Sequence, residues 1–270
     1  MPQDITTSVL RNTDLGHGNF LLEFEAPQWS AEMKPAQFFM IGIPGSETLL
    51  RRPFSVCGLR GTFDDAPADS VQVLYKVVGK GTALLASLKP GAQLDVLGPL
   101  GNGFAQPHDP RARPVLVAGG IGSAPFPALI VELTAHGIRP WMIYGARSAG
   151  DLPLLDWFDE HSERLIVTTE DGSAGQRGLV TGPLEELIAA NASGSLHLYG
   201  CGPEPMLKAV ARLALEHGVR CDLSMEAHMA CGFGVCLGCV VPTHRPGSAE
   251  IHYDRVCVEG PVMDAGVLAW

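Results

Sequence analysis

The sequence predicts an α+β protein of several domains: an N-terminal antiparallel β-barrel, a central α/β domain built on a parallel sheet, and a small C-terminal lobe. Its 270 residues exceed the usual size of one domain. The N-terminal third holds short β-rich segments, the middle alternates strand and helix, and the end is rich in Cys and Gly. We expect the three units to span residues 1–103, 112–223 and 224–270.

The N-terminal segments carry β-branched, aromatic and aliphatic residues, and Gly and Pro separate them. Strands are expected over residues 19–25, 38–43 and 71–78. Short strands at this spacing are typical of a small antiparallel barrel. One helix is expected from Thr82 to Leu88, and the polar, Gly- and Pro-rich stretch 101–113 marks the end of this domain.

From Pro114 onward, apolar strands alternate with helices, which implies a parallel sheet covered on both faces. Prolines near the starts of the two later helices support their placement, because a missing N–H costs little in the first helical turn. After about Ser224 no helical period remains. The strands are expected over residues 114–118, 139–144, 165–169 and 196–199, and the helices over residues 128–136, 183–191 and 205–217.

The chain carries 19 Lys and Arg against 29 Asp and Glu, a formal net charge of −10. This balance argues against a nucleic-acid partner, because phosphate backbones need concentrated positive charge. No apolar run reaches the length of a membrane span, and the N-terminus lacks the basic and apolar regions of a signal peptide. We therefore expect a cytoplasmic protein with no membrane partner.

Four of the seven cysteines lie within the last 40 residues, and such clustering in a cytosolic protein suggests a metal site rather than disulfides. The first three are spaced C-x4-C-x2-C and 17 residues separate the third from the fourth, which is the plant-type [2Fe–2S] spacing. Interleaved glycines let such a loop curl and point backbone N–H groups at the sulfurs. The predicted ligands are Cys231, Cys236, Cys239 and Cys257.

A structural zinc site is the alternative for these thiols, although zinc usually takes two short Cys pairs and only one C-x2-C occurs here. Four unrelated buried thiols are a further alternative, which the glycines between them disfavour. Cys57 and Cys221 lie outside the pattern and are expected to pack as small hydrophobic residues.

A second group of residues, in the N-terminal domain, suits a flavin. An Arg can neutralise a pyrophosphate, an aromatic ring can pack on a flavin, and a Ser hydroxyl can reach a ring nitrogen. The Arg-Arg-Pro-Phe-Ser run is expected to end a barrel strand, and a Gly-Thr pair opens the expected helix, where a phosphate can sit. Each motif alone has a common alternative, since Arg-Pro pairs are frequent and a Gly-Thr pair can simply cap a helix. The order of the motifs along the chain favours a flavin site. The candidates are Arg52, Pro53, Phe54, Ser55, Leu74, Tyr75, Lys76, Gly81 and Thr82.

Two glycine-containing turns of the central domain follow strands and precede helices, where backbone N–H groups and the helix dipole favour a pyrophosphate. The first departs from the Rossmann fingerprint because Pro125 replaces the third glycine. The second is a Cys-Gly-Pro run, and a buried thiol at a tight turn is the alternative for Cys201. The stretch from Tyr144 to Ser148 is expected to border the ribose and does not decide between NAD and NADP. The candidates are Gly119, Gly120, Gly122, Ser123, Cys201, Gly202 and Pro203.

The Arg-Pro-Phe-Ser motif, the Gly-Thr helix start and the later glycines resemble the ferredoxin–NADP reductase superfamily. In that superfamily the motif of Arg, an aromatic or apolar residue and Ser binds the flavin, and the Cys of Cys-Gly-Pro lies near the hydride path. The resemblance implies a flavin site at residues 52–55 and 74–76, a pyrophosphate seat at residues 81–82, and a catalytic position for Cys201.

The C-terminal segment resembles the electron-transfer subunit of the NAD-dependent, two-subunit (class 1B) dihydroorotate dehydrogenases. The matching segments are residues 224–232, 234–239 and 256–262, together with 98–104 in the first domain. The resemblance therefore covers nearly the whole chain. Ring-hydroxylating oxygenase reductases attach a complete ferredoxin domain, and the segment after Ser224 is too short for one.

The resemblance implies three cofactors: FAD in the barrel, NAD(P) in the central domain and a [2Fe–2S] cluster in the lobe. It also implies a separate FMN-containing catalytic subunit that oxidises dihydroorotate to orotate in pyrimidine biosynthesis, with two copies of each subunit in a heterotetramer. Electrons would then cross the cluster to FAD and reduce NAD. No acid–base residue for pyrimidine chemistry is identifiable in this chain, which suits an electron-transfer role.

Two alternatives remain open from the sequence. Related subunits serve hydrogenase-type and glutamate synthase-type complexes, so another NAD(P)H-linked partner is possible. A non-catalytic iron–sulfur scaffold or redox sensor is the alternative from a different class, although intact flavin and dinucleotide motifs argue against it.

Overall fold

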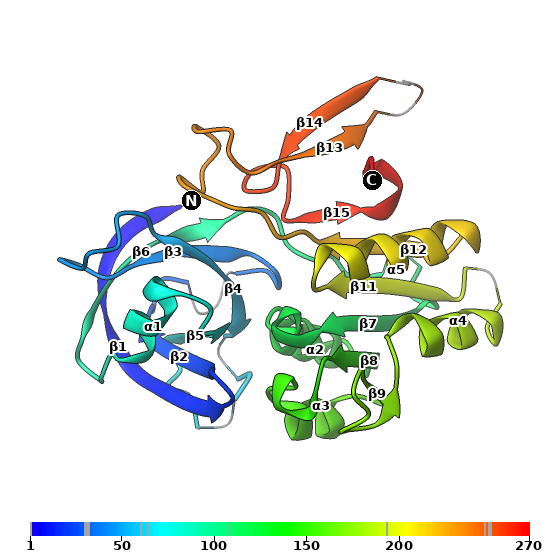
Figure 1. Cartoon of the computed structure of the whole chain (residues 1–270), viewed down its shortest axis with the longest axis horizontal. Coiled ribbons are helices and arrows are strands. Elements are labelled where there is room, and N and C mark those ends of the chain that lie inside the picture. Colours follow the sequence, from blue (N-terminus) through cyan, green and yellow to red (C-terminus); the bar gives the residue numbers. More distant parts are fainter. Residues whose placement is uncertain are drawn as a thin grey trace.

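The chain folds into the predicted antiparallel barrel, parallel-sheet domain and small lobe (Figure 1). The computed structural model describes residues 2–29, 33–59, 61–63, 65–107, 109–192, 194–245, 247 and 250–270. None of the helices in these ranges is long and apolar enough to cross a membrane. The predicted domain limits remain a proposal, and the last strand of the lobe joins the sheet of the central domain.

Six antiparallel strands close the N-terminal barrel in the order β1-β2-β5-β4-β3-β6. Its interior is filled by large apolar side chains such as Phe24, Phe39 and Val73, all fully buried. The predicted bounds of β2 are confirmed, and α1 begins two residues before the predicted helix start. The elements are β1 (Gln3–Gly16), β2 (Asn19–Glu25), β3 (Phe38–Gly42), β4 (Arg52–Gly58), β5 (Ser70–Lys76), α1 (Lys80–Ala86) and β6 (Gln93–Leu100).

The expectation that the Arg-Pro-Phe-Ser run ends a strand is wrong, because Arg52 begins β4. Residues 52–55 pair with β3 on one side. On the other side, pairing with β5 starts only at Val56, opposite Val73. Since Pro53 has no N–H to give to a second neighbour, it suits a stretch that is paired on one side alone. The barrel wall is therefore open between β4 and β5 at these residues.

Seven strands form the central sheet in the order β10-β9-β8-β7-β11-β12-β15, and only β15 runs antiparallel to its neighbour. Apolar side chains of α2 and α3 pack on one face, and those of α4 and α5 on the other. The strands are β7 (Arg113–Gly119), β8 (Trp141–Ala146), β9 (Arg164–Thr169), β10 (Gln176–Arg177), β11 (Leu196–Cys201), β12 (Arg220–Ser224) and β15 (Val262–Asp264). The helices are α2 (Phe126–Ala135), α3 (Leu155–His161), α4 (Thr181–Ala189) and α5 (Glu204–Glu216), with 3-10 turns η1 (Gly120–Ser123), η2 (Ala149–Asp151) and η3 (Ala265–Val267).

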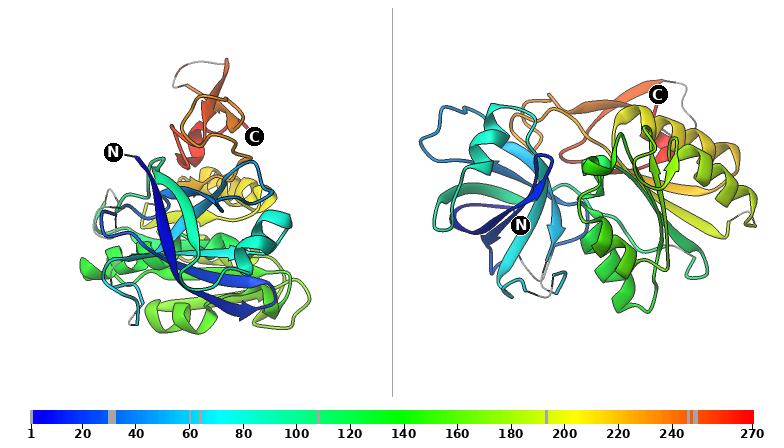
Figure 2. Two further views of the ribbon diagram at one scale, coloured as in Figure 1. Left: turned by 90° about the vertical axis from the view of Figure 1, so that its left-hand side faces the viewer. Right: turned by 60° about the horizontal axis from the view of Figure 1, so that its bottom comes forward.

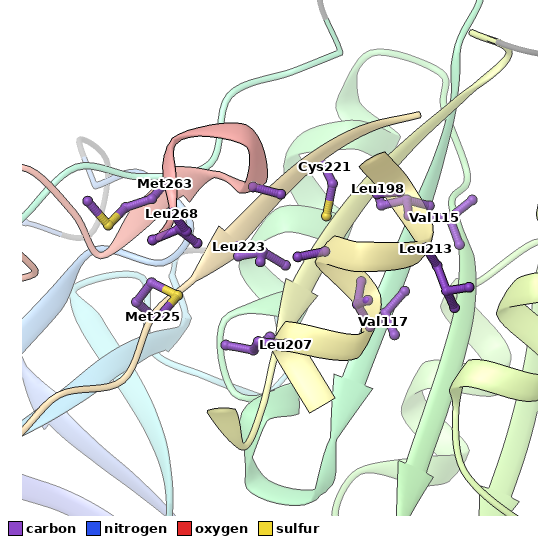
Figure 3. Packing of buried hydrophobic residues seen from close by; sticks show 14 of the residues in the cluster. Val115, Val117, Leu198, Leu207, Leu213, Cys221, Leu223, Met225, Met263 and Leu268 are labelled. Atoms are coloured by element: carbon purple, nitrogen blue, oxygen red, sulfur yellow. The ribbon is translucent and has the colours of Figure 1, made fainter. Parts of the chain in front are cut away.

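The four strands and three helices predicted for the central domain are confirmed, with ends that differ by no more than two residues. Figure 3 shows the core under α5, which includes Leu207 and Leu223. This core depends on Gly200, in the middle of β11. A methyl group on Gly200 would lie 2.4 Å from Leu223 Cδ2 and 3.5 Å from Leu207 Cδ2. The missing side chain of Gly200 thus lets α5 and β12 pack closely.

The C-terminal lobe carries the cysteine-bearing loop, residues 231–239, which continues into a hairpin of β13 (Val240–His244) and β14 (Ile251–Arg255). The hairpin projects away from the central sheet (Figure 2). The chain then returns as β15, which pairs with β12. The lobe is therefore anchored at its start by β12 and at its end by β15, with the cysteine loop between them.

The substitution Leu223→Ala should lower the free energy of unfolding by about 3 kcal/mol, because it leaves a cavity beneath α5. Leu215→Ala is the matched control, since Leu215 is 53% exposed on α5. Its expected cost is under about 1 kcal/mol. Urea denaturation of both variants and the wild type measures the difference. Equal losses in the two variants would contradict the assigned core.

Candidate functional site

Two turns meet at the carboxyl edge of the central sheet, one after β7 and one after β11. A methyl group on Gly119 would lie 2.7 Å from Met206 Sδ, and one on Gly122 would lie 2.6 Å from the carbonyl oxygen of Cys201. The turns are therefore packed directly against each other, and larger residues would separate them. Nucleotides bind at this edge of parallel sheets.

A cavity of about 540 Å³, here called the sheet cavity, opens at these turns. Its walls come from the ends of β7, β8 and β9 and from the starts of α4 and α5. The size is typical of a small-molecule site. The predicted residues that line it are Lys76, Gly119, Gly120 and Pro203. Lining residues that were not predicted include Ile121, Asp151, Glu170 and Met206.

A second cavity of about 390 Å³, here called the barrel cavity, lies where β4 separates from β5 and faces the central domain. The rings of Phe54 and Tyr75 meet edge to face in its wall, with centroids 5.7 Å apart. Aromatic and aliphatic walls suit a planar ring system. The predicted residues that line it are Arg52, Pro53, Phe54, Ser55, Leu74, Tyr75, Lys76, Thr82, Gly122 and Cys201.

Arg52 lies across the first turn of α1. A methyl group on Gly81 would lie 2.3 Å from Arg52 Nε, so the glycine makes room for the guanidinium. The Thr82 hydroxyl accepts hydrogen bonds from the N–H groups of Val78 and Gly79, at 2.9 and 3.2 Å. Thr82 therefore closes this turn, and Arg52 supplies the charge that an anionic group would need.

Lys76 and Ile121 line both cavities, so the two cavities share a wall. The Lys76 ammonium forms an ion pair with Asp151 of η2, which ties the barrel to the central domain. The hydrogen bond from Lys76 holds the pKa of Asp151 below its ordinary value. Planar groups bound in the two cavities would therefore meet at Lys76 and Ile121.

Cys201 ends β11 and lines the barrel cavity, with 4% of its surface exposed. Burial raises the pKa of its thiol, and the charge of Glu226 adds to the rise. The thiol is therefore protonated at neutral pH and is not a thiolate nucleophile. Its position in the wall of the barrel cavity suits packing beside a planar ring system bound there.

The loop of residues 231–239 directs backbone N–H groups at one of the predicted ligands. The Cys231 sulfur accepts a hydrogen bond from the N–H of Cys236 at 3.5 Å, and the N–H groups of Phe233 and Val235 also bond to it. Burial acts to raise the pKa of Cys231, but these donors together lower it to about 6. The loop therefore stabilises a thiolate, which is the form that binds iron.

Cys239 and Cys257 are buried, and their thiols are hydrogen-bonded to each other. Burial, and then this contact, raise the pKa of Cys257. The thiols thus form two pairs, Cys231 with Cys236 and Cys239 with Cys257. In the described part of the chain, no three His, Cys, Asp or Glu side chains surround one point as the ligands of a single ion would. Two thiol pairs fit the four thiolates of a two-iron cluster.

Asn102 fastens the lobe to the end of the barrel. Its side-chain amide donates to the carbonyls of Glu259 and Val262, both at 2.9 Å, and its Oδ1 accepts from the N–H of Val262 at 2.9 Å. Its backbone N–H donates to the carbonyl of Gly260 at 2.7 Å. The segment 98–104, which the sequence marked only by resemblance, therefore positions the lobe.

Two of the predicted residues support the turns from behind. Ser123 is fully buried, and its Oγ lies 3.0 Å from the hydroxyl of Tyr144. Gly202 packs on the other turn, where a methyl group would lie 3.0 Å from the nitrogen of Gly119. The lining residue Ile121 was missed because a single apolar side chain carries no chemical signal, but its place between two predicted glycines could have indicated it.

Two family models match the chain. The iron–sulfur cluster binding domain of dihydroorotate dehydrogenase B matches residues 226–269, and the oxidoreductase NAD-binding domain matches residues 116–212. The chain is 37% identical over 257 residues to the dihydroorotate dehydrogenase B (NAD(+)) electron transfer subunit of Caldanaerobacter subterraneus subsp. tengcongensis, with 94% of each chain covered. It is 41% identical over 237 residues to the subunit of the same name from Geobacillus kaustophilus, with 86% of each covered.

Among solved structures, the chain is similar to an NADH-dependent reduced ferredoxin-NADP oxidoreductase, whose structure gave insights into flavin-based electron bifurcation. The two are 29% identical with a TM-score of 0.81, over 98% of this chain and 90% of the other. The predicted ferredoxin–NADP reductase-like fold is therefore confirmed over the length of the chain.

The substitution Cys257→Ser should remove or destabilise the [2Fe–2S] cluster and leave the flavin in place, because the cluster and the barrel cavity are held by different elements. The same result is expected for Cys231, Cys236 and Cys239. Iron and acid-labile sulfide per chain, with flavin absorbance, measure both. Cys221→Ala is the control, since this buried cysteine lies in β12 outside the loop. A full cluster in the Cys257 variant would remove that ligand.

The substitution Gly81→Ala should lower the FAD content of the purified protein several-fold, because its methyl group displaces the Arg52 guanidinium. Gly79→Ala is the control, since a methyl group there meets no atom within 4 Å. Acid extraction followed by chromatography identifies and quantifies the flavin. Recovery of FMN alone from the wild type would refute the pyrophosphate seat, and equal FAD in both variants would refute the role of Arg52.

Proposed function

The chain belongs to the family of dihydroorotate dehydrogenase B electron transfer subunits, and we propose that it carries electrons from an FMN-containing catalytic subunit to NAD through a [2Fe–2S] cluster and FAD. In this proposal dihydroorotate is oxidised on the partner and NAD is reduced on this chain, in pyrimidine biosynthesis. The proposed setting is the cytoplasm, where thiols such as Cys57 and Cys221 stay reduced.

The observation that carries the proposal is that three sites adjoin one after another: the sheet cavity, the barrel cavity and the cysteine loop. The sheet cavity and the barrel cavity share Lys76 and Ile121. The wall of the barrel cavity includes Met225 and Met229, and Cys231 follows Met229 after one intervening residue. Two residues of chain reach at most about 7 Å, so the cysteine loop begins beside the barrel cavity. This order supports stepwise passage of electrons from one site to the next.

We assign the barrel cavity to the isoalloxazine ring of FAD, with Phe54 and Tyr75 packing on it and Arg52 facing the pyrophosphate. The sheet cavity is assigned to the nicotinamide dinucleotide, whose pyrophosphate would face the turn at Gly119 and Gly120. The four cysteines are assigned as ligands of the cluster. The proposed domain limits remain 1–103, 112–223 and 224–270.

When bound, a flavin would take up electrons singly from an iron–sulfur cluster and pass two of them, as a hydride, to NAD. For that exchange, the residues of this chain would position the bound cofactors and separate them from solvent. Ile121 lies between the cavities, and the protonated Cys201 thiol fills the barrel cavity's wall without offering a nucleophile. The Lys76–Asp151 ion pair holds the two domains together at the same point.

The proposed partner docks on the face of the lobe that carries the cysteine loop. Phe233, Val235 and Leu237 are 53%, 72% and 60% exposed, and the exposed Cys236 lies between the last two in this loop. Tyr253 of β14 is also 67% exposed. Large exposed apolar groups mark interaction sites, so they favour a partner surface next to the cluster. An FMN subunit and a complex of two copies of each chain are inferred from the family resemblance.

Reconstitution with the purified FMN subunit tests this function. This chain alone should oxidise NADH with ferricyanide, because the two cavities adjoin, and should not oxidise dihydroorotate. Addition of the FMN subunit should create dihydroorotate-dependent NAD reduction. The cluster-ligand variants should lose that activity at least about tenfold and keep most of their NADH–ferricyanide activity, since electrons from the partner must cross the cluster.

Two outcomes would contradict the proposal in different ways. Reduction of NAD by dihydroorotate without a partner would refute the two-subunit arrangement. If no FMN subunit bound this chain, a hydrogenase-type or glutamate synthase-type partner would replace it. A visible spectrum with cluster absorption but no flavin absorption would favour the iron–sulfur scaffold or sensor.

A further inference from the structure

The hydroxyl group of Tyr144 lies beneath the turn that follows β7. Tyr144 belongs to β8 and is fully buried. Its hydroxyl oxygen lies 3.2 Å from the carbonyl of Gly120, 3.0 Å from the carbonyl of Pro153 and 3.0 Å from Ser123 Oγ. One side chain thus joins both ends of η1 to the segment that follows η2.

The hydrogen-bond donors and acceptors around the Tyr144 hydroxyl fix the direction of each of its hydrogen bonds. A tyrosine hydroxyl has one proton to donate, which the carbonyls of Gly120 and Pro153 share, and the Ser123 hydroxyl donates to its oxygen. Burial raises the pKa of Tyr144. The Tyr144 hydroxyl therefore keeps its proton, and remains a hydrogen-bond donor, at the pH values used to study nicotinamide dinucleotides.

Gly120 needs such a bond because its backbone is at φ +53°, a region that glycine enters and leaves at little cost. Without a partner for its carbonyl, the peptide between Gly120 and Ile121 could rotate. A trans peptide holds its C=O and N–H on opposite sides. A Gly120 carbonyl that points at the buried Tyr144 therefore directs the N–H of Ile121 away from the core.

The N–H of Ile121 has no partner within η1, because the first N–H groups of a helical turn lack one. Gly120 and Ile121 both line the sheet cavity. An N–H group directed away from Tyr144 at this point is therefore available to an anion in that cavity. Phosphate oxygens are the acceptors that such turns take.

We propose that Tyr144 is a positioning residue for the nicotinamide dinucleotide: its hydroxyl holds the carbonyl of Gly120 inward, so that the N–H of Ile121 faces the pyrophosphate. This inference rests on the proposed function of the sheet cavity. Tyr144 does not line either cavity, and it acts through the peptide that it orients. Its role explains why Ser123, a predicted binding residue, is buried beneath the turn.

The substitution Tyr144→Phe tests the proposal in the full chain loaded with its cofactors. The KM for NADH and the dissociation constant for NAD should each rise about tenfold, since one hydrogen bond to the turn is lost. The kcat with ferricyanide and the FAD content should change less than about twofold. Isothermal titration with NAD gives the affinity without turnover, and steady-state kinetics separate KM from kcat.

Tyr199→Phe is the matched control. Tyr199 lies on the neighbouring strand β11 and is also fully buried, but its hydroxyl donates to the carbonyl of Ala105 at 2.8 Å, away from the turn. Both variants should lose thermal stability to a similar degree, and only Tyr144→Phe should lose affinity for NAD. Ser123→Ala, which leaves the tyrosine in place, should weaken NAD binding about two- to threefold and serves if Tyr144→Phe fails to fold.

Unchanged NAD affinity in Tyr144→Phe, or an equal loss in Tyr199→Phe, would overturn the proposal. If Tyr144→Phe did not fold, unchanged affinity in Ser123→Ala would overturn it as well. A wild-type protein that bound no nicotinamide dinucleotide would instead refute the proposed function. The two failures are therefore distinguishable.

Discussion

The site depends on the hydrogen bonds of Asn102, which hold the lobe against the end of the barrel. The lobe, with its hairpin and a cysteine-bearing loop, is too small to bury a core of its own. Its position is set by Asn102 and by the pairing of β15 with β12. The cysteine loop also packs on the barrel, where a methyl group on Gly232 would lie 2.4 Å from Met40 Cγ. These contacts place the predicted cluster ligands beside the barrel cavity.

The barrel cavity exists because one strand is paired on a single side. Residues 52–55 of β4 bond to β3, and the side toward β5 is open until Val56. The opening faces the carboxyl edge of the central sheet, where turns replace strands. The two domains are tied at this edge by the Lys76–Asp151 ion pair and by the hydrogen bond from Asn19 to the carbonyl of Gly150, 3.1 Å long. The unpaired side of β4 and the carboxyl edge of the central sheet thus form two adjoining cavities.

Much of the fold could be predicted because its signals are local. The strands ending at Gly119 and Cys201 are apolar runs followed by glycines, and the cysteine spacing marks the loop of the lobe. The long strand β1 was missed because its side chains are largely polar and only partly buried. The start of β4 was misplaced because the Arg-Arg-Pro-Phe-Ser run was expected to end a strand, whereas Arg52 begins one. The contacts of Asn102 join residues 157 and 160 positions apart, which no local pattern can indicate.

The exposed apolar residues of the lobe would connect the stability of the protein to the proposed partner. A loop that holds Phe233, Val235 and Leu237 in water gains nothing from their hydrophobicity in the isolated chain. When a partner covers them, their burial stabilises the complex, and the bound state is favoured by mass action. The same contact would shield Cys236, the most exposed of the four predicted ligands. Proteins that use a small lobe to present a metal cluster therefore face a compromise: the surface that lets electrons cross to a partner is also the least protected part of the isolated chain.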